Sequence, residues 1–123
     1  MQYTQELANR RWGRMADVVI TREDRGKTRT VRAGDTLRIE IFENPATGYR
    51  WEVEASDERF LSPAGTSFSA DSPGSTGSGG LRIFTFSAHS PGATEIRLVR
   101  RRSWEAPELA VERFGVSLRI VEG

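Results

Sequence analysis

The stretch Thr-Leu-Arg-Ile-Glu-Ile-Phe, residues 36–42, alternates apolar and polar side chains with a period of two. Its leucine and two isoleucines fall on one side, and its arginine and glutamate fall on the other. Successive side chains of a β-strand point to opposite faces of a sheet, whereas an α-helix repeats every 3.6 residues. The stretch therefore predicts a strand with one face in a hydrophobic core and the other in water.

Two further regions repeat this alternation. Trp51, Val53 and Ala55 are separated by glutamates, and apolar side chains recur at every second position of residues 114–120. Shorter apolar or β-branched runs are bounded by glycine and proline. They are residues 18–20, 28–31, 60–61, 67–68, 81–88 and 96–98. No amphipathic helix interrupts them, so the pattern predicts an all-β fold, an immunoglobulin-like β-sandwich of about seven to eight strands with Trp51 in its core.

A length of 123 residues predicts one folded domain. Residues 1–16 are polar, and we expect them to form a loosely ordered N-terminal extension before a domain that spans residues 17–123. No stretch is long and apolar enough to span a membrane. The extension has arginines but no apolar core, so it is not an intact signal peptide. As the sequence stands it predicts a cytoplasmic protein, or a periplasmic or secreted one if a signal peptide was removed.

The composition excludes several kinds of active site. The chain has no cysteine and one histidine, so a thiolate nucleophile, a cysteine-ligated metal and the usual multi-histidine metal sites are ruled out. We therefore expect a protein that is not an enzyme and that binds no cofactor. His89 lies in a His-Ser-Pro-Gly turn and should be exposed, and Glu52 and Glu54 are expected to be hydrated rather than catalytic. The net charge of +1 argues against a nucleic-acid binder.

Three connections between the predicted strands have unusual sequences. Residues 44–49 read Asn-Pro-Ala-Thr-Gly-Tyr, in which proline fixes φ and glycine can adopt a positive φ, so the loop is stiff at one end and bent at the other. Residues 77–80 read Gly-Ser-Gly-Gly and let the backbone approach another surface closely; they end a polar loop predicted for residues 69–80. Residues 100–105 read Arg-Arg-Arg-Ser-Trp-Glu and place an aromatic ring among charges.

In this order, the three segments resemble the loops of the chagasin family of protein inhibitors of papain-like cysteine proteases. In that family an Asn-Pro-x-Thr-Gly-Tyr loop, a Gly-x-Gly-Gly loop and an Arg-Pro-Trp loop lie at the same end of an immunoglobulin-like sandwich. The resemblance covers residues 18–121 or so. Ser103 departs from it, because the family usually has proline there. Ala46 replaces the first of two threonines, and the second is retained as Thr47.

The resemblance implies a reversible, competitive inhibitor that fills the protease cleft with three loops. Thr47 would enter beside the catalytic cysteine and histidine, with its hydroxyl able to hydrogen-bond the histidine or a neighbouring group. Trp104 would lie against an aromatic rim on the primed side, and the glycine loop would bind the non-primed side through its backbone. The implied protease-binding residues are Asn44, Pro45, Ala46, Thr47, Gly48, Tyr49, Gly77, Ser78, Gly79, Gly80, Arg102, Ser103 and Trp104.

Some alternatives stay open at this point. Tyr49 either contacts the protease or packs beneath its own loop and holds it in shape. The chain as a whole is either a monomeric inhibitor or an immunoglobulin-like interaction or adhesion module that does not inhibit proteases. The arginines at 100–102 should point to opposite faces of a strand end, which favours a solvated surface over a phosphate-binding patch.

Overall fold

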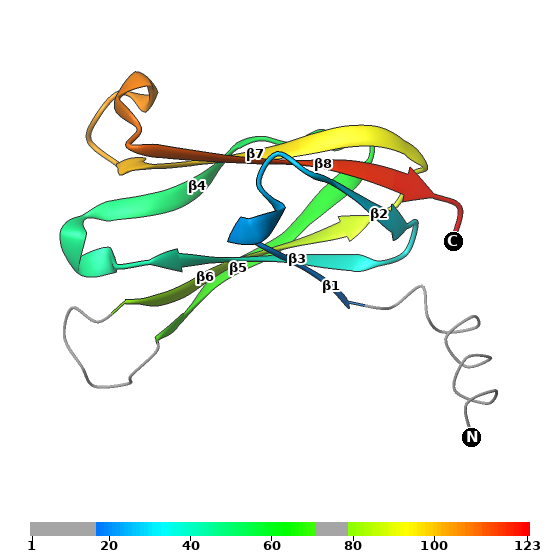
Figure 1. The fold of residues 1–123 in the computed structure, drawn as a ribbon, viewed down its shortest axis with the longest axis horizontal. Helices are drawn as coiled ribbons and strands as arrows, with labels where there is room; N and C mark the ends of the chain where they lie inside the picture. Colours follow the sequence, from blue (N-terminus) through cyan, green and yellow to red (C-terminus); the bar gives the residue numbers. More distant parts are fainter. Residues whose placement is uncertain (1–16, 71–78) are drawn as a thin grey trace.

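Two four-stranded β-sheets pack face to face in the computed structural model, which describes residues 17–70 and 79–123 (Figure 1). The strands are β1 (Asp17–Thr21), β2 (Thr28–Arg32), β3 (Thr36–Glu43), β4 (Tyr49–Ala55), β5 (Leu61–Ala70), β6 (Gly80–Ala88), β7 (Gly92–Arg102) and β8 (Glu112–Val121). One sheet has the order β1-β3-β6-β5 and the other has the order β2-β8-β7-β4. Short 3-10 turns, η2 (Arg22–Asp24), η3 (Pro45–Thr47) and η4 (Pro107–Leu109), lie in the connections.

The pairing of the strands is mixed. β1 runs parallel to β3 and β2 runs parallel to β8, whereas the other neighbouring strands are antiparallel. The connection from β3 to β4 crosses from one sheet to the other. The all-β, immunoglobulin-like sandwich predicted from the sequence is confirmed, with eight strands in the described part of the chain.

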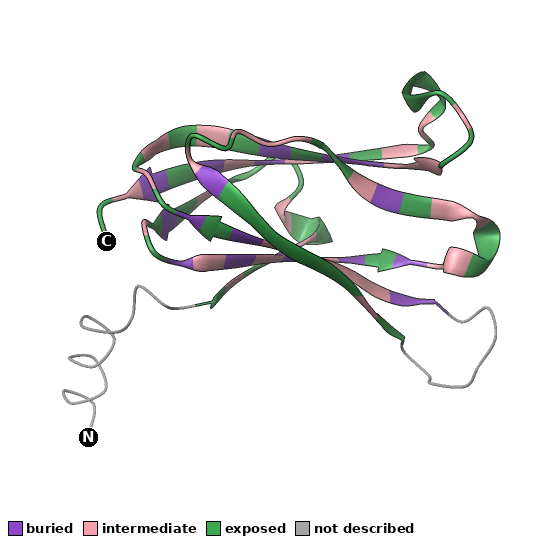
Figure 2. Cartoon of the chain, turned by 180° about the vertical axis from the view of Figure 1, so that it is seen from behind, coloured by how far each residue is buried: buried purple, intermediate pink, exposed green. Residues whose placement is uncertain are grey.

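The hydrophobic core lies between the sheets, and the alternation in β3 has the expected phase. Leu37 and Ile39 are fully buried and Ile41 is 1% exposed, while Trp51 of β4 is 4% exposed, as predicted. Figure 2 shows the resulting alternation of buried and exposed residues along the strands. Other core residues come from both sheets: Ile20, Val31, Leu61, Phe84, Phe86, Ala88, Ile96, Leu98, Phe114, Val116, Leu118 and Ile120.

β5 differs from its sequence-based prediction. Its two short runs were expected to be separated by proline and glycine, but β5 is one strand of ten residues with a register shift between Pro63 and Gly65. It extends to Ala70, which pairs with Gly80, so the loop predicted for residues 69–80 is shorter than expected. β5 is an edge strand whose side chains are mostly exposed (Figure 2). Leu61 anchors its start in the core, and backbone pairing with β6 continues along the rest. Hydrophobicity does not reveal such a strand.

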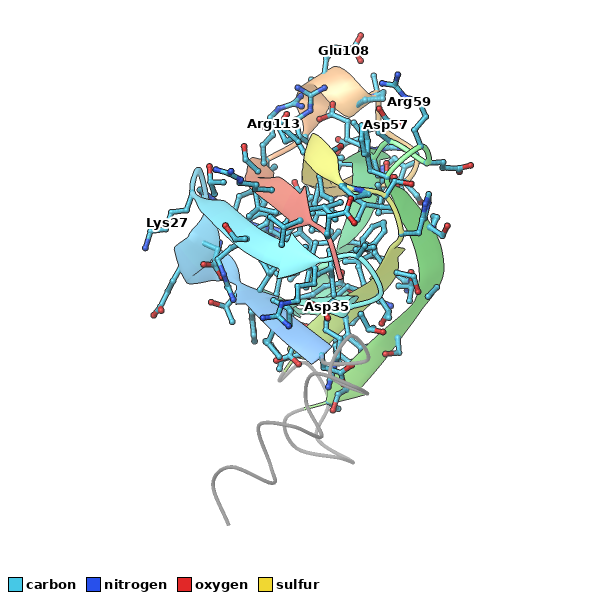
Figure 3. The ribbon with its side chains drawn as sticks, turned by 90° about the vertical axis from the view of Figure 1, so that its right-hand side faces the viewer. Lys27, Asp35, Asp57, Arg59, Glu108 and Arg113 are labelled. Atoms are coloured by element: carbon cyan, nitrogen blue, oxygen red, sulfur yellow. The ribbon has the colours of Figure 1, made fainter. Side chains whose placement is uncertain are left out.

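The end of the sandwich that faces the viewer in Figure 3 carries short polar connections. Arg59 and Asp57 form an ion pair there, with 2.7 Å between Nη2 and Oδ2. Hydrogen bonds from Arg59 lower the pKa of the Asp57 carboxyl. His89 is exposed, as predicted, and its Nε2 lies 3.1 Å from the carbonyl oxygen of Glu58. Within residues 17–70 and 79–123, no helix is long and apolar enough to cross a membrane.

Candidate functional site

The strand register brings the three unusual segments to one end of the sandwich. Glu43, the last residue of β3, pairs with Gly80, the first residue of β6. Tyr49, the first residue of β4, pairs with Arg102, the last residue of β7. Figure 1 shows the β3–β4 and β7–β8 connections and the start of β6 together on the left of the molecule, away from the C-terminus. Of the predicted site residues, Gly77 and Ser78 lie outside the described residues.

The first connection is a single 3-10 turn with a cap at each end. Pro45 occupies the first turn of η3, and the Asn44 side chain accepts a hydrogen bond from the amide of Ala46 at 3.1 Å. Gly48 ends the turn with φ of 83°, which a residue with a side chain rarely adopts, and its amide donates to the Pro45 carbonyl at 3.0 Å. The stiffness and the bend predicted from proline and glycine are thus both present.

The Thr47 hydroxyl is engaged within its own loop. It donates its proton to the Asn44 carbonyl at 2.8 Å and accepts a hydrogen bond from the Tyr49 amide at 3.2 Å. A hydroxyl has one donor and two acceptor positions. Thr47 is exposed. Its hydroxyl therefore retains one acceptor position for an outside group and has no proton left to donate.

Gly79 and Gly80 are required by contacts within the chain. Gly79 has φ of 78°, and a Cβ there would lie 2.7 Å from the ring of Phe42 and 3.0 Å from the Glu43 carbonyl oxygen. A Cβ on Gly80 would overlap the Ser69 carbonyl oxygen. The close backbone approach predicted from these glycines is therefore an approach to the chain's own strands β3 and β5.

The third connection presents an aromatic ring beside the first. The amide of Glu105 donates to the Arg102 carbonyl at 3.0 Å, which closes a turn over residues 102–105 with Trp104 in its middle. Trp104 is 72% exposed. Its ring lies against Gly48, since a Cβ built on Gly48 would be 3.2 Å from the Trp104 Cη2. The tryptophan and the tip of the first loop thus form one continuous surface.

Tyr49 packs on the arginines of β7. The guanidinium of Arg102 lies 4.4 Å from the centre of the Tyr49 ring, and that of Arg100 lies 5.7 Å from it. The Nε of Arg102 is buried and has no hydrogen-bond partner in the described part of the chain. Through these contacts Tyr49 packs between the first and third loops and supports both. The predicted alternation of the three arginines also holds, since Arg101 pairs with Glu52 instead.

A buried carboxylate beneath the first loop was not predicted from the sequence. Glu43 is 1% exposed, and its Oε1 accepts a hydrogen bond from the Trp51 amide at 2.8 Å. Its Oε2 lies 2.7 Å from the Nη2 of Arg82 on β6, the neighbouring strand of the same sheet. The bond to Trp51 of β4 therefore joins the two sheets at the base of the loop, and Arg82 neutralises the carboxylate there. The sequence contained the necessary signal, because position 43 continues the inward phase set by Leu37, Ile39 and Ile41.

Glu52 and Glu54 are accessible to water, as expected, with side chains 46% and 33% exposed, and each also pairs with an arginine. Oε1 of Glu52 accepts a hydrogen bond from the Nε of Arg101 at 2.6 Å, and Oε2 of Glu54 accepts one from the Nη1 of Arg113 at 2.9 Å. The first pair joins the neighbouring strands β4 and β7, and the second links β4 to β8 across β7 in the same sheet. Periodicity shows that such residues face outward, but it does not show which cation lies opposite them.

A cluster of positive charge lies beside the first loop. Glu112 accepts hydrogen bonds from Arg22, from Arg25 at 2.6 Å and from Arg100 at 3.2 Å. Burial alone would raise the pKa of the Glu112 carboxyl, but the hydrogen bonds and charges of these arginines outweigh it and lower that pKa. A hollow of about 320 Å³ next to Thr47 is lined by this cluster. No group of three histidines, cysteines or acidic residues in the described ranges is arranged to hold a metal ion.

The three segments thus lie at one end of the β-sandwich, and comparisons with known proteins specify the class to which the chain belongs. Residues 30–118 match the family model of the chagasin family of peptidase inhibitors, I42. The chain is 30% identical to chagasin of Trypanosoma cruzi over 106 residues, which is 81% of this chain and 94% of chagasin. It is also 30% identical to amoebiasin-1 of Entamoeba histolytica over 103 residues, 82% of this chain and 97% of amoebiasin-1.

The fold agrees with the same assignment. The crystal structure of a cysteine protease inhibitor from Entamoeba histolytica superimposes with a TM-score of 0.74 at 24% identity, covering 86% of this chain and 96% of that one. The chain belongs to the chagasin family of peptidase inhibitors. The resemblance inferred from the three loops is therefore confirmed.

Proposed function

We propose that this protein is a reversible, competitive inhibitor of papain-like cysteine proteases that occludes the active-site cleft with its three loops. The observation that carries the proposal is the continuous surface formed by the exposed tip at Thr47 and the exposed ring of Trp104, which is in contact with Gly48. Membership of a peptidase-inhibitor family supports the class of partner. In this proposal residues 17–123 form the inhibitor domain, and the protein is active as a monomer.

The hydrogen bonds of Thr47 suggest how the tip meets the catalytic centre. The catalytic cysteine and histidine of papain-like proteases form a thiolate and an imidazolium, in which both ring nitrogens are donors. Thr47 has an acceptor position left and no free proton. The hydroxyl would therefore accept a hydrogen bond from the imidazolium, so that the inhibitor stabilises the ion pair and leaves the thiolate without a carbonyl to attack.

Affinity would come from loops that are already in their bound shape. The two capped ends of η3 and the turn at residues 102–105 restrict the backbone before docking, so little conformational entropy is lost on binding. An exposed aromatic ring such as that of Trp104 is the kind of residue that most often dominates binding energy at protein interfaces. The glycine segment would add backbone hydrogen bonds along the non-primed side.

Steady-state inhibition of papain tests the proposal directly. Purified protein at increasing concentration should raise the apparent KM for a small peptide substrate and leave kcat unchanged. Activity should return on dilution, because no covalent bond forms. A correctly folded sample that does not inhibit papain or a cathepsin at micromolar concentration would refute the proposal and favour a non-inhibitory interaction module.

Two kinds of variant at the tip locate the site. Replacing Thr47 and Gly48 together by bulky residues should abolish inhibition to a degree far beyond any loss of folding stability. Thr47→Ser keeps the hydroxyl and Thr47→Val keeps the shape, so they form a matched pair. We expect Thr47→Val to weaken inhibition by about tenfold or more, since it removes both the loop hydrogen bonds and the acceptor, while Thr47→Ser stays within about threefold of the wild type.

A further inference from the structure

The guanidinium of Arg101 lies inside the third connection and donates hydrogen bonds to its backbone. Its Nη1 is 2.5 Å from the carbonyl oxygen of Glu105, 3.3 Å from that of Arg102 and 3.4 Å from that of Ser103. The Arg101 side chain is 17% exposed, so these bonds are largely shielded from water. One cation therefore contacts three carbonyl groups of the turn that carries Trp104.

The other restraints on the turn are neutral or at its surface: the hydrogen bond from the Glu105 amide to the Arg102 carbonyl, and the contacts of the Trp104 ring with Gly48 and with the Arg102 guanidinium at 5.8 Å. Ser103 occupies its second position, where serine leaves φ free and proline would fix it. Trp104 occupies the next position, and at 72% exposure its ring is not held by burial. Hydrogen bonds from a charged donor are stronger than neutral ones. Arg101 therefore supplies the charged hydrogen bonds among the restraints on this turn.

Arg101 is itself oriented by β4. Its Nε donates to Oε1 of Glu52 at 2.6 Å, and Glu52 lies three residues after the start of the strand that leaves the first loop. The stacking of Arg102 on Tyr49 at 4.4 Å is a second link between the same two regions. This ion pair and this cation–π contact add to the packing of the Trp104 ring on Gly48, and together they join the first and third loops.

We propose that Arg101, oriented by Glu52, is a positioning residue that holds Trp104 in its binding conformation and so sets the affinity for the protease. The proposal rests on the inhibitory function proposed above. Arg101 does not need to contact the protease, because its donors are directed at carbonyl groups of its own chain. Without it, the turn would have to be ordered during docking, at a cost in affinity.

Ser103→Pro offers an independent way to restore the restraint. No residue other than glycine has a positive φ among the described residues, so the φ of Ser103 is negative, as that of a proline is. Arg102 before it ends β7 in the extended conformation that a residue preceding proline prefers. Proline is also favoured at the second position of such turns. The substitution should therefore fit the existing backbone.

The test compares Arg101→Met, Ser103→Pro and the double variant with the wild type. Methionine keeps an unbranched stem and removes the guanidinium. We expect Arg101→Met to raise the inhibition constant for papain by about ten- to hundredfold. Ser103→Pro should lower the inhibition constant about threefold or more in the Arg101→Met background, and by a clearly smaller factor in the wild-type background, where Arg101 already restrains the turn.

A second measurement does not depend on the protease. In ¹⁵N relaxation of the free protein, the amides of Trp104 and Glu105 should show lower heteronuclear NOE values in Arg101→Met and should recover in the double variant. Arg38→Met is the matched control, because it also removes an arginine paired with a glutamate, at 3.0 Å, but on β3 of the other sheet. It should change neither the NOE values nor the inhibition constant.

The outcomes separate the two proposals. If the wild type does not inhibit papain, the inhibitory function fails while the NOE values still test the role of Arg101 in the turn. If the wild type inhibits and Arg101→Met inhibits equally with rigid amides, the positioning role is overturned. Equal effects of Ser103→Pro in both backgrounds would overturn it as well. Should Arg101→Met not fold, Glu52→Gln replaces it, and an unchanged inhibition constant and unchanged NOE values in that variant refute the proposal.

Discussion

Replacing Glu43 by alanine should destabilise the whole fold and not only the loop above it. The variant leaves the Trp51 amide without its acceptor at 2.8 Å and leaves Arg82 without its anion at 2.7 Å. Breaking a buried ion pair by removing one partner costs about 3–5 kcal/mol. The lower end applies here, because the Arg82 side chain is 16% exposed and retains a cation–π contact with the ring of Phe68 at 5.2 Å. We therefore expect a loss of about 3 kcal/mol.

Thermal or urea unfolding followed by circular dichroism measures this loss. For a domain of this size, about 3 kcal/mol corresponds to a fall in Tm of roughly 12–15 °C. Glu40→Ala is the control on the same strand: Glu40 also pairs with an arginine, but at the surface, so its removal should cost less than about 1 kcal/mol. The double variant Glu43→Gln with Arg82→Met keeps an acceptor for the Trp51 amide and removes the cation, and should lose only about 1–2 kcal/mol.

The reasoning about Glu43 fails if Glu43→Ala and Glu40→Ala destabilise equally, or if the double variant is less stable than Glu43→Ala. Either result would mean that the carboxylate is accessible to water in solution, and that the base of the first loop is held by other contacts.

Three further variants test separate parts of the site. Trp104→Ala should raise the inhibition constant for papain by about thirtyfold or more, and it should change the free energy of unfolding by less than about 0.5 kcal/mol because the ring is 72% exposed. Gly79→Ala should destabilise the protein by about 1–3 kcal/mol in urea unfolding, since it combines a positive φ with overlap against Phe42. Glu112→Gln should be less stable than the wild type at pH 7. The lowered pKa of Glu112 makes its contribution fully present above about pH 4.3 and lost as the pH falls below that value, so the two unfolding curves should converge in acid.

The sequence predicted the parts of this structure that depend on local pattern. The alternation over residues 36–42 identified a half-buried strand, and Trp51 lies in the core as expected. The 3-10 turn after Asn44 follows from proline, glycine and a capping side chain, which act over a few residues. Local pattern could not predict which charged side chains pair, because the partners are far apart in the sequence. Arg101 lies 49 residues from Glu52, and Arg82 lies 39 residues from Glu43.

The two ion pairs that the sequence did not predict help to fix the shape of the proposed binding surface. Loops that are to enter a protease cleft must stay exposed, so hydrophobic burial cannot fix their shape. Hydrogen bonds from charged side chains rooted in the strands can do so. Glu43 with Arg82 supports the base of the first loop, and Arg101 with Glu52 supports the turn that carries Trp104. Because Glu52 is 46% exposed, its charge is partly screened by water and the pair contributes only modestly to folding, whereas loop order contributes directly to affinity. Replacing Glu52 by glutamine should therefore weaken inhibition more than it lowers stability.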